Sequence, residues 1–214
     1  MNRYFYADSI TNFVGSSENG ILGALAAENS FDLVDLQRNA WQFEIQMLKE
    51  ILRNKADGQI LFEYSIPRLG KRIDVVLLLQ GIVFALEFKV GAEVYYRQDS
   101  EQVWDYALDL KNFHEASRDL TIVPVLIATE APDSSATQEF CLYDDHVFEP
   151  ILCNAGGLRE VIAKITQEHG NHADLSHWGY SRYMPTPTII QAASSLYLNH
   201  SVEDITRSEA SGEN

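Results

Sequence analysis

An amphipathic repeat between Asp35 and Asn54 is the clearest pattern of apolar and polar positions in the chain. Apolar side chains recur there at the spacing of one helical face: Trp41, Ile45, Leu48, Ile51 and Leu52. Glu44 lies inside this apolar stripe. Because a buried, unpaired carboxylate is costly, Glu44 has a partner or a metal, or it lies at the margin of the stripe with its carboxylate in water.

Three apolar segments with the composition of β-strands follow this helix, at Ile60–Ile66, Ile73–Leu79 and Ile82–Val90. Gln80-Gly81 separates the last two, and the glycine of this turn dipeptide can take a positive φ. The two segments around it are therefore predicted to form a β-hairpin.

The hairpin brings charged residues together. With a loop of two or four residues, Asp74 lies directly opposite Glu87, and like charges at such a pair destabilise a hairpin. Lys89 projects from the same face as Glu87, so the group would suit a divalent cation with a basic side chain beside it. The simpler interpretation is that these charges mark where the strands leave the core, since short motifs often occur by chance.

A second helix is predicted from Asp99, as its N-cap, to about Ala116, followed by a continuous apolar strand at Leu120–Thr129. Such a strand is expected to be covered on both faces, and a strand–helix–strand connection implies parallel pairing. The order helix, three strands, helix, strand predicts an α/β fold with a mixed β-sheet flanked by helices.

The flanking segments have weaker patterns. Residues 1–34 are expected to form a small N-terminal cap or lead-in, and residues 176–214 a C-terminal tail or linker, so that the main domain spans residues 35–175. Within that domain, residues 141–153 are expected to add one or two strands and Leu158–Gln167 an amphipathic helix.

Composition limits the class of protein. A chain of 214 residues, 46% of them apolar, can bury a substantial core. The sequence has no run of 18 uninterrupted apolar residues, so no membrane span is predicted. The first residues do not resemble a secretory signal. Cys141 and Cys153 lack metal-ligand spacing and are too few for a disulfide scaffold. We therefore expect a protein of the reducing cytoplasm, with no membrane partner.

The net charge of −15 argues against a general nucleic-acid binder, because phosphate contacts need Lys and Arg. Basic residues nearly balance acidic ones between Glu63 and Arg118, so the acidity lies mostly elsewhere. If nucleic acid is the substrate, we expect its binding to be weak and locally guided, or a partner to supply the basic surface.

Gln102 and Tyr106 lie one helical turn apart on the second helix, just after the strand that carries Glu87 and Lys89. Gln102 also fits a capping box that begins at Asp99, and Tyr106 could equally belong to the core. Their order and face nevertheless fit groups beside the carboxylate pair.

With these residues in place, the chain resembles the PD-(D/E)XK nuclease superfamily, especially its RecB-like branch. The resemblance covers about residues 35–130 and includes the α-β-β-β-α-β order of the core. Its motifs are Glu44, Asp74, the Glu-Phe-Lys triplet at 87–89 and the Gln-x3-Tyr pattern at 102–106. The proline that often precedes the aspartate is replaced by Ile73. Four motifs in this order are much more specific than the acidic hairpin alone.

The resemblance implies metal-assisted hydrolysis of a phosphodiester bond. Asp74 and Glu87 would bind Mg²⁺ or Mn²⁺ together with the carbonyl of Phe88 and waters. Glu44 would be a further acidic ligand, either directly or through water.

The other motif residues would act on the water and the phosphate. Lys89 would orient or deprotonate the water, or neutralise the phosphate in the transition state. Gln102 would position the backbone phosphate or a metal-bound water, and Tyr106 would buttress Gln102. Three cations are candidates for contact with the nucleic acid, although exposed, solubilising charge is the simpler interpretation of each: Lys71, Arg72 and Arg97.

A second resemblance concerns residues 178–200. This segment looks like the one just upstream of the motor in bacterial nuclease–helicase fusions with a schlafen-type helicase. The usual phosphate-binding motif of such motors, G-x4-G-K-[ST], does not occur in the 214 residues. A helicase would therefore act in cis in a longer protein, or in trans.

The leading hypothesis is a Mg²⁺-dependent nuclease acting on DNA, with RNA not excluded, coupled to a helicase; the resemblance suggests phage defence or DNA repair, and the chain could form an oligomer. The alternative is a catalytically inactive nuclease fold that docks a helicase or another protein partner, which the acidic charge favours. A weaker third hypothesis is a nucleotide or small-phosphate hydrolase that uses the same metal site.

Overall fold

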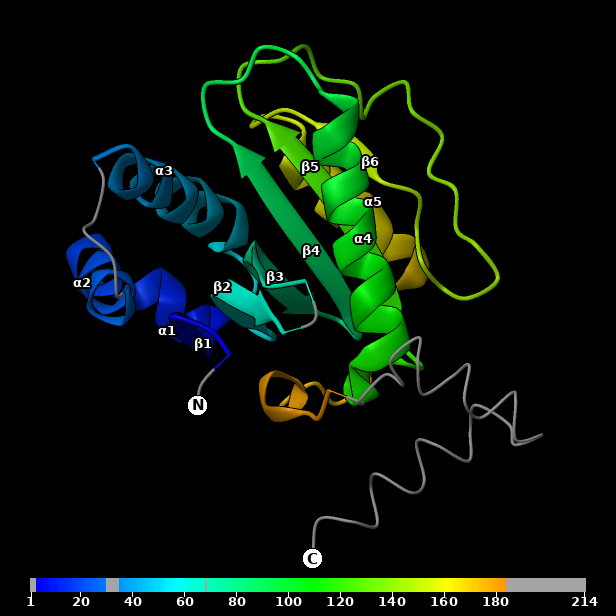
Figure 1. The fold of residues 1–214 in the computed structure, drawn as a ribbon, viewed down its shortest axis with the longest axis horizontal. Helices are drawn as coiled ribbons and strands as arrows, with labels where there is room; N and C mark the ends of the chain where they lie inside the picture. The colour runs from blue at the N-terminus through cyan, green and yellow to red at the C-terminus, as the bar shows by residue number, and fades with distance from the viewer. Residues whose placement is uncertain (1–2, 30–34, 68, 184–214) are drawn as a thin grey trace, which may run out of the picture.

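The computed structural model describes residues 3–29, 35–67 and 69–183. Within these ranges, six strands form one mixed sheet in the order β1-β2-β3-β4-β5-β6, as Figure 1 shows in part. The strands β1 to β4 pair antiparallel with one another, and β5 and β6 continue the sheet in parallel to β4. The strands are β1 (Tyr6–Ser9), β2 (Gln59–Ile66), β3 (Lys71–Leu79), β4 (Ile82–Lys89), β5 (Thr121–Ala128) and β6 (Ile151–Cys153).

Helices cover both faces of this sheet (Figure 1). The helix α4 packs on one face, whereas the other helices share an apolar core with the opposite face. The helices are α1 (Ile10–Gly15), α2 (Glu18–Glu28), α3 (Asp35–Leu52), α4 (Arg97–Phe113) and α5 (Leu158–His169). The predicted α/β fold with a mixed sheet flanked by helices is therefore confirmed.

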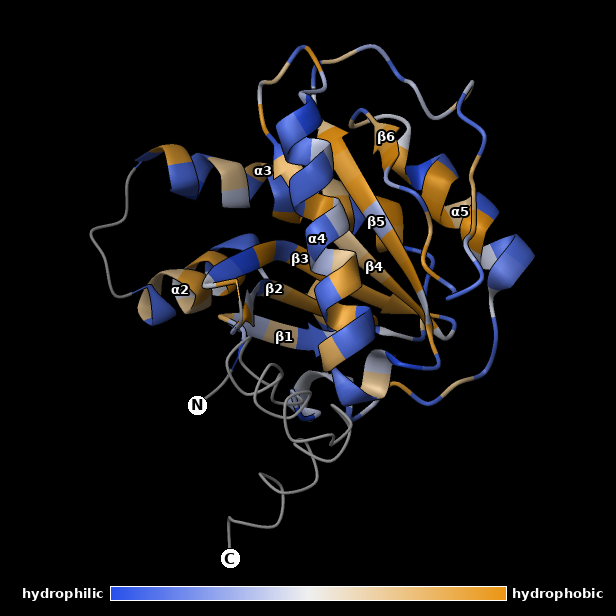
Figure 2. Cartoon of the chain, turned by 45° about the vertical axis from the view of Figure 1, so that its right-hand side comes forward, coloured by the Kyte–Doolittle hydropathy of each residue, from blue (hydrophilic) through white to orange (hydrophobic). Residues whose placement is uncertain are grey.

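The apolar strands explain why both faces are covered. β4 and β5 are almost wholly buried, and Figure 2 shows them as largely hydrophobic strands beneath the amphipathic helix α4. Because neither strand alternates between apolar and polar residues, each needs an apolar partner layer on both sides. The predicted strand at Leu120–Thr129 is confirmed as β5, in parallel to β4.

The predicted hairpin is confirmed in detail. β3 and β4 pair antiparallel from Leu79 opposite Ile82 to Val75 opposite Leu86, and the loop is the dipeptide Gln80-Gly81. Its φ values of 48° and 72° are both positive, as a type I′ turn requires. The ladder ends at this pair, so the residues that follow it directly, Asp74 on β3 and Glu87 on β4, are not paired in it; their direct opposition stays a prediction.

Replacing Gly81 by Ala tests the turn. A Cβ atom there would lie 1.8 Å from the side chain of Asn171, in addition to the strain of φ +72°. We expect a loss in the free energy of unfolding of about 2–3 kcal/mol, from left-handed backbone strain and from displacement of Asn171, measured by urea denaturation. Gly91→Ala is the matched control, because its φ is +79° but nothing lies within 4 Å of the added Cβ. Equal losses in the two variants would show that Asn171 plays no part.

The start of the second helix corrects one prediction. α4 begins at Arg97, and Tyr96 rather than Asp99 is its N-cap. Asp99 lies in the first turn, where its carboxylate pairs with Lys89 at 3.5 Å, and a negative charge is favourable near a helix N-terminus. Gln102 therefore lies beyond the first turn, and the predicted capping box is wrong.

The chain segments outside the predicted main domain also pack on the sheet. β1 pairs with the edge of β2, and near the end of the described chain Trp178 lies against Tyr64 and His114. Residues 178–200 were predicted to resemble the segment upstream of a helicase motor, and most of them, from residue 184 on, lie outside the described residues. In the part of the chain that is described, no helix has the length and apolarity needed to cross a membrane.

Candidate active site

The candidate site lies where two neighbouring strands lose their regular alternation. Phe62 and Tyr64 would share a face in a regular strand, but they pack on opposite faces of the sheet. Val75 and Ile73, their partners on β3, do the same. The irregularity lies at the same height on both strands. As a result, the residues between these pairs, Glu63 on β2 and Asp74 on β3, belong to neither of the apolar cores on the two faces of the sheet.

Glu63 occupies this level on β2, and sequence reasoning missed it. Its φ of +53° is uncommon for a residue other than glycine. The carboxylate is buried between two donors, because Trp41 Nε1 donates to Oε1 over 2.8 Å and Arg72 Nε donates to Oε2 over 2.7 Å. The signal was an acidic residue in the middle of an apolar strand, the same kind of exception that marked Glu44.

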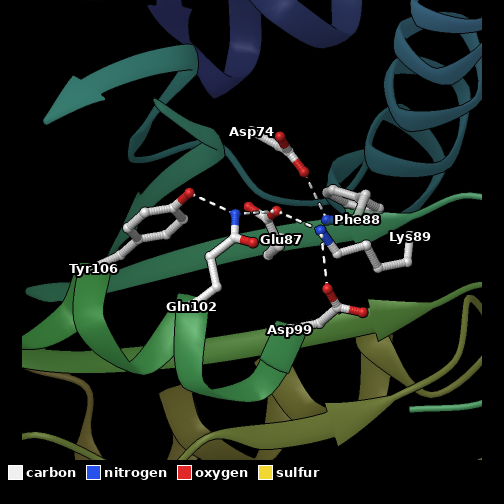
Figure 3. A network of polar contacts seen from close by, with 7 residues as sticks. All are labelled: Asp74, Glu87, Phe88, Lys89, Asp99, Gln102 and Tyr106. Atoms are coloured by element: carbon white, nitrogen blue, oxygen red, sulfur yellow. Dashed lines mark hydrogen bonds and ion pairs between the residues drawn. The ribbon is translucent and has the colours of Figure 1, made fainter. Parts of the chain in front are cut away.

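Asp74 lies at the same height on β3, and its carboxylate is hydrogen-bonded to the opposite strand of the hairpin, β4. The backbone N–H of Phe88 donates to Asp74 Oδ2 over 2.7 Å (Figure 3). Burial, and then the charge of Glu87, raise the pKa of Asp74 well above its usual value, although the bond from Phe88 opposes them. The carboxylate is therefore held in place in an environment that disfavours its charge.

Glu87 and Lys89 on β4 form a polar network with the first turns of α4 (Figure 3). Lys89 Nζ donates to Glu87 Oε1 over 2.9 Å and pairs with Asp99. Gln102 Nε2 donates to the same oxygen of Glu87 over 2.8 Å and to the hydroxyl of Tyr106 over 2.6 Å. The structure thus brings together the motif residues of both elements, with Asp99 as a further member.

The charge state of Lys89 limits its chemistry. Burial lowers the pKa of its ammonium group, but the neighbouring carboxylates of Glu87, Asp99 and Asp74 raise it more, so the pKa is raised overall. An ammonium with a raised pKa is a poor proton acceptor. Of the roles considered for Lys89, orienting a water or neutralising a phosphate fits this environment better than deprotonating the water.

Glu44 lies inside the protein and not at its margin. It is 4% exposed, and burial followed by the charges of Asp74, Glu63 and Glu87 raises its pKa well above the usual value. Its Oε2 atom and Glu87 Oε2 are both buried without a hydrogen-bond partner. Each such oxygen costs about 1–3 kcal/mol, which a bound cation would offset.

The donor atoms fit a hard cation, but the protein does not enclose one. Among the described residues, no group of three or more His, Cys, Asp or Glu side chains is arranged to hold a metal ion. The free oxygens of Glu44 and Glu87 are carboxylate oxygens, which Mg²⁺ prefers. Mg²⁺ is commonly held by only one or two carboxylates, with waters and substrate phosphate completing its shell, so the residues present fit this ion.

Two of the acidic residues, Asp74 and Glu63, line an open cleft of about 440 Å³. The wall of this cleft includes three residues of the candidate site, Asp74, Gln102 and Tyr106. It also includes Gln37 on α3. A substrate phosphate in this cleft would meet Asp74 and the head of Gln102. The full lining is Gln37, Glu63, Gly70, Lys71, Arg72, Asp74, Gln102 and Tyr106.

The three cations considered for nucleic-acid contact have different environments. Lys71 lines the cleft and is exposed. Arg72 also lines it, but its guanidinium group binds Glu63 and lies over the ring of Phe5. Arg97 is not among the residues that line the cleft and pairs with Glu101 at 2.7 Å on the surface. The structure brings only Lys71 and Arg72 together at the cleft.

Comparisons with protein-family models, with curated proteins and with solved structures found no match to this chain.

Proposed function

We propose that this chain is a metal-dependent nuclease of the PD-(D/E)XK type that hydrolyses phosphodiester bonds in DNA. The observation that carries the proposal is the cluster of Asp74, Glu87 and Lys89 (Figure 3). Asp74 lines an open cleft together with Gln102, which binds Glu87. A binding module has no need of a repulsive carboxylate pair at such a place. The order α3-β2-β3-β4-α4-β5 is the order of the core in that superfamily and supports the same proposal.

Asp74 and Glu87 would hold the metal, together with the carbonyl of Phe88 and waters, and Glu44 would bind it directly or through a water. When bound, Mg²⁺ or Mn²⁺ would lower the pKa of a water and stabilise negative charge on the phosphate. The unpartnered oxygens of Glu44 and Glu87 support this assignment.

The remaining site residues act on the substrate. The ammonium of Lys89 lies between two carboxylates and would neutralise charge that develops on the phosphate. Gln102 has its amide nitrogen on Glu87 and Tyr106, so its carbonyl oxygen is directed elsewhere and can orient a water. Tyr106 is 1% exposed and fixes Gln102 through its hydroxyl.

The setting of this activity is part of the proposal. The net charge of −15, with Lys71 and Arg72 at the cleft, supports weak binding of DNA, or of RNA, that a helicase in cis or in trans would strengthen. The free thiols of Cys141 and Cys153 support a cytoplasmic location. Phage defence or DNA repair is the biological role that the resemblance suggests.

Cleavage of labelled single- and double-stranded DNA and RNA tests the proposal. We expect cleavage with Mg²⁺ or Mn²⁺, none with EDTA, and a loss of about 100-fold or more in Lys89→Met, because this variant removes the charge beside the phosphate. Lys164→Met on α5 is the matched control, since Lys164 is exposed and packs over Phe140. Undiminished cleavage by Lys89→Met would reject this site.

A catalytically inactive docking module is the second candidate. It is favoured by the lack, among the described residues, of a ready group of three metal ligands, and by the two carboxylates that already hold Lys89. If purified protein cleaves none of the four substrates with either cation, alone or with a helicase added, the docking module becomes the better description.

A further inference from the structure

We infer that Glu63 is a positioning residue of the candidate site, which fixes the strand that carries Asp74 against the helix that carries Glu44. The inference rests on the proposed function and adds a residue to it. Neither a metal nor the substrate needs to touch Glu63 for this role, because Glu63 acts by placing the carboxylates of Asp74 and Glu44.

The contacts of Glu63 join the two elements concerned. Its Oε1 accepts from Trp41 on α3, and its Oε2 accepts from Arg72 on β3. Trp41 is three residues from Glu44 on the same helical face, and both are buried. Arg72 is two residues from Asp74 along β3. The carboxylate of Glu63 therefore ties together the neighbours of two proposed metal ligands, Glu44 and Asp74.

The backbone of Glu63 supports the same conclusion. A left-handed conformation is unfavourable for a residue with a side chain, and such outliers persist where the surrounding structure fixes them, often at functional sites. Here the outlier, at φ +53°, coincides with the level at which β2 and β3 change faces. That change places Asp74 on the wall of the cleft instead of inside either apolar core.

A direct role as a metal ligand fits Glu63 less well. Unlike Glu44 and Glu87, which each keep a buried oxygen without a partner, Glu63 has a donor on both oxygens. One of these donors is a guanidinium group, which forms a strong, charge-assisted bond. The side chain is therefore already engaged in holding α3 and β3.

Glu63→Asp separates positioning from simple negative charge. Asp keeps the charge and tolerates a positive φ better than most residues do, but it is one methylene shorter and cannot span the same two donors. We expect Mn²⁺ binding to the protein alone, measured by calorimetry, to weaken about 10- to 100-fold, as for partners of metal ligands elsewhere. We expect kcat for DNA cleavage to fall by a similar factor, with KM for DNA little changed.

Trp41→Phe provides a second, milder variant, because it keeps an aromatic ring in the core while removing the donor to Oε1. If Glu63 positions the site through this hydrogen bond, Trp41→Phe and Glu63→Gln will each weaken Mn²⁺ binding. Their effects on the affinity will not add in the double variant. These two variants keep the inference testable if Glu63→Asp fails to fold.

The outcomes separate the inference from the proposed function. Wild-type Mn²⁺ affinity and kcat in folded Glu63→Asp would overturn the inference, and so would a loss confined to thermal stability. In both cases cleavage by the wild type would leave the proposed function standing. If the wild-type protein itself binds no Mn²⁺, or if Asp74→Asn binds it as tightly as the wild type, the proposed function fails and the role of Glu63 fails with it.

Discussion

Asp74→Asn will lose cleavage activity by about 100-fold or more and will unfold at a higher temperature than the wild type when no metal is present. The loss follows from removal of a proposed metal ligand. The gain in stability follows because burial and the charge of Glu87 disfavour the ionised Asp74 carboxylate, and the neutral amide removes this repulsion. The amide oxygen can still accept the bond from the N–H of Phe88. Activity and stability would thus change in opposite directions, as is common at functional sites.

Asp119→Asn is the matched control, because Asp119 is exposed on the loop that precedes β5. This variant should change neither the cleavage rate nor the melting temperature measured by calorimetry in EDTA. A lower melting temperature for Asp74→Asn would show that the ionised carboxylate stabilises the fold, and retained cleavage would remove Asp74 from the site.

The metal-free protein will become less stable as the pH rises above about 4. Burial, followed by neighbouring charges, raises the pKa of Glu44 and of Asp74 in the folded state, and burial raises that of Glu87 although Lys89 opposes it. The folded protein therefore binds more protons than the unfolded chain above the ordinary pKa of these groups, and its free energy of unfolding falls with increasing pH. The stabilisation is complete below that value. It falls while the groups are ionised only in the unfolded chain, and its loss is complete once the pH exceeds their raised pKa values in the folded state.

Urea denaturation at pH 5 and pH 8 in EDTA measures this effect. Mn²⁺ at a concentration of 100 times its dissociation constant should restore about 2.7 kcal/mol at pH 8, because it binds the ionised carboxylates of the folded state. Glu44→Gln should flatten the pH dependence. If the stability of the metal-free protein rises between pH 5 and pH 8 and Glu44→Gln leaves that slope unchanged, the carboxylates do not interact as described.

The hairpin could be predicted from sequence because its determinants are local. A two-residue loop of type I′ needs positive φ at both positions, and Gln80-Gly81 supplies a glycine for one of them. Once the loop is fixed, the period of two along each strand sets the register up to Val75 opposite Leu86 with no long-range information, and Asp74 and Glu87 follow this pair. The helical spacing of the apolar stripe in α3 placed Glu44 in the same way.

The N-cap of α4 could not be predicted in this way, because a distant partner decides it. Asp99 is a good capping residue by type, but its carboxylate pairs with Lys89 on β4. Arg72 is a similar case, since the sequence alone does not distinguish it from the other basic residues expected on the surface. In the fold its guanidinium group is held by Glu63 and lies over Phe5.

The sequence by itself determined the α/β class, the register of the hairpin and the order of the motif residues, because these follow from the spacing of apolar residues and the chemistry of one turn. Only the tertiary structure decided that Glu44 is buried beside the other carboxylates, that Lys89 is held between Glu87 and Asp99, and that Glu63 joins α3 to β3. These features depend on how separate elements pack, and the burial that results raises the pKa values of Glu44, Asp74 and Glu87.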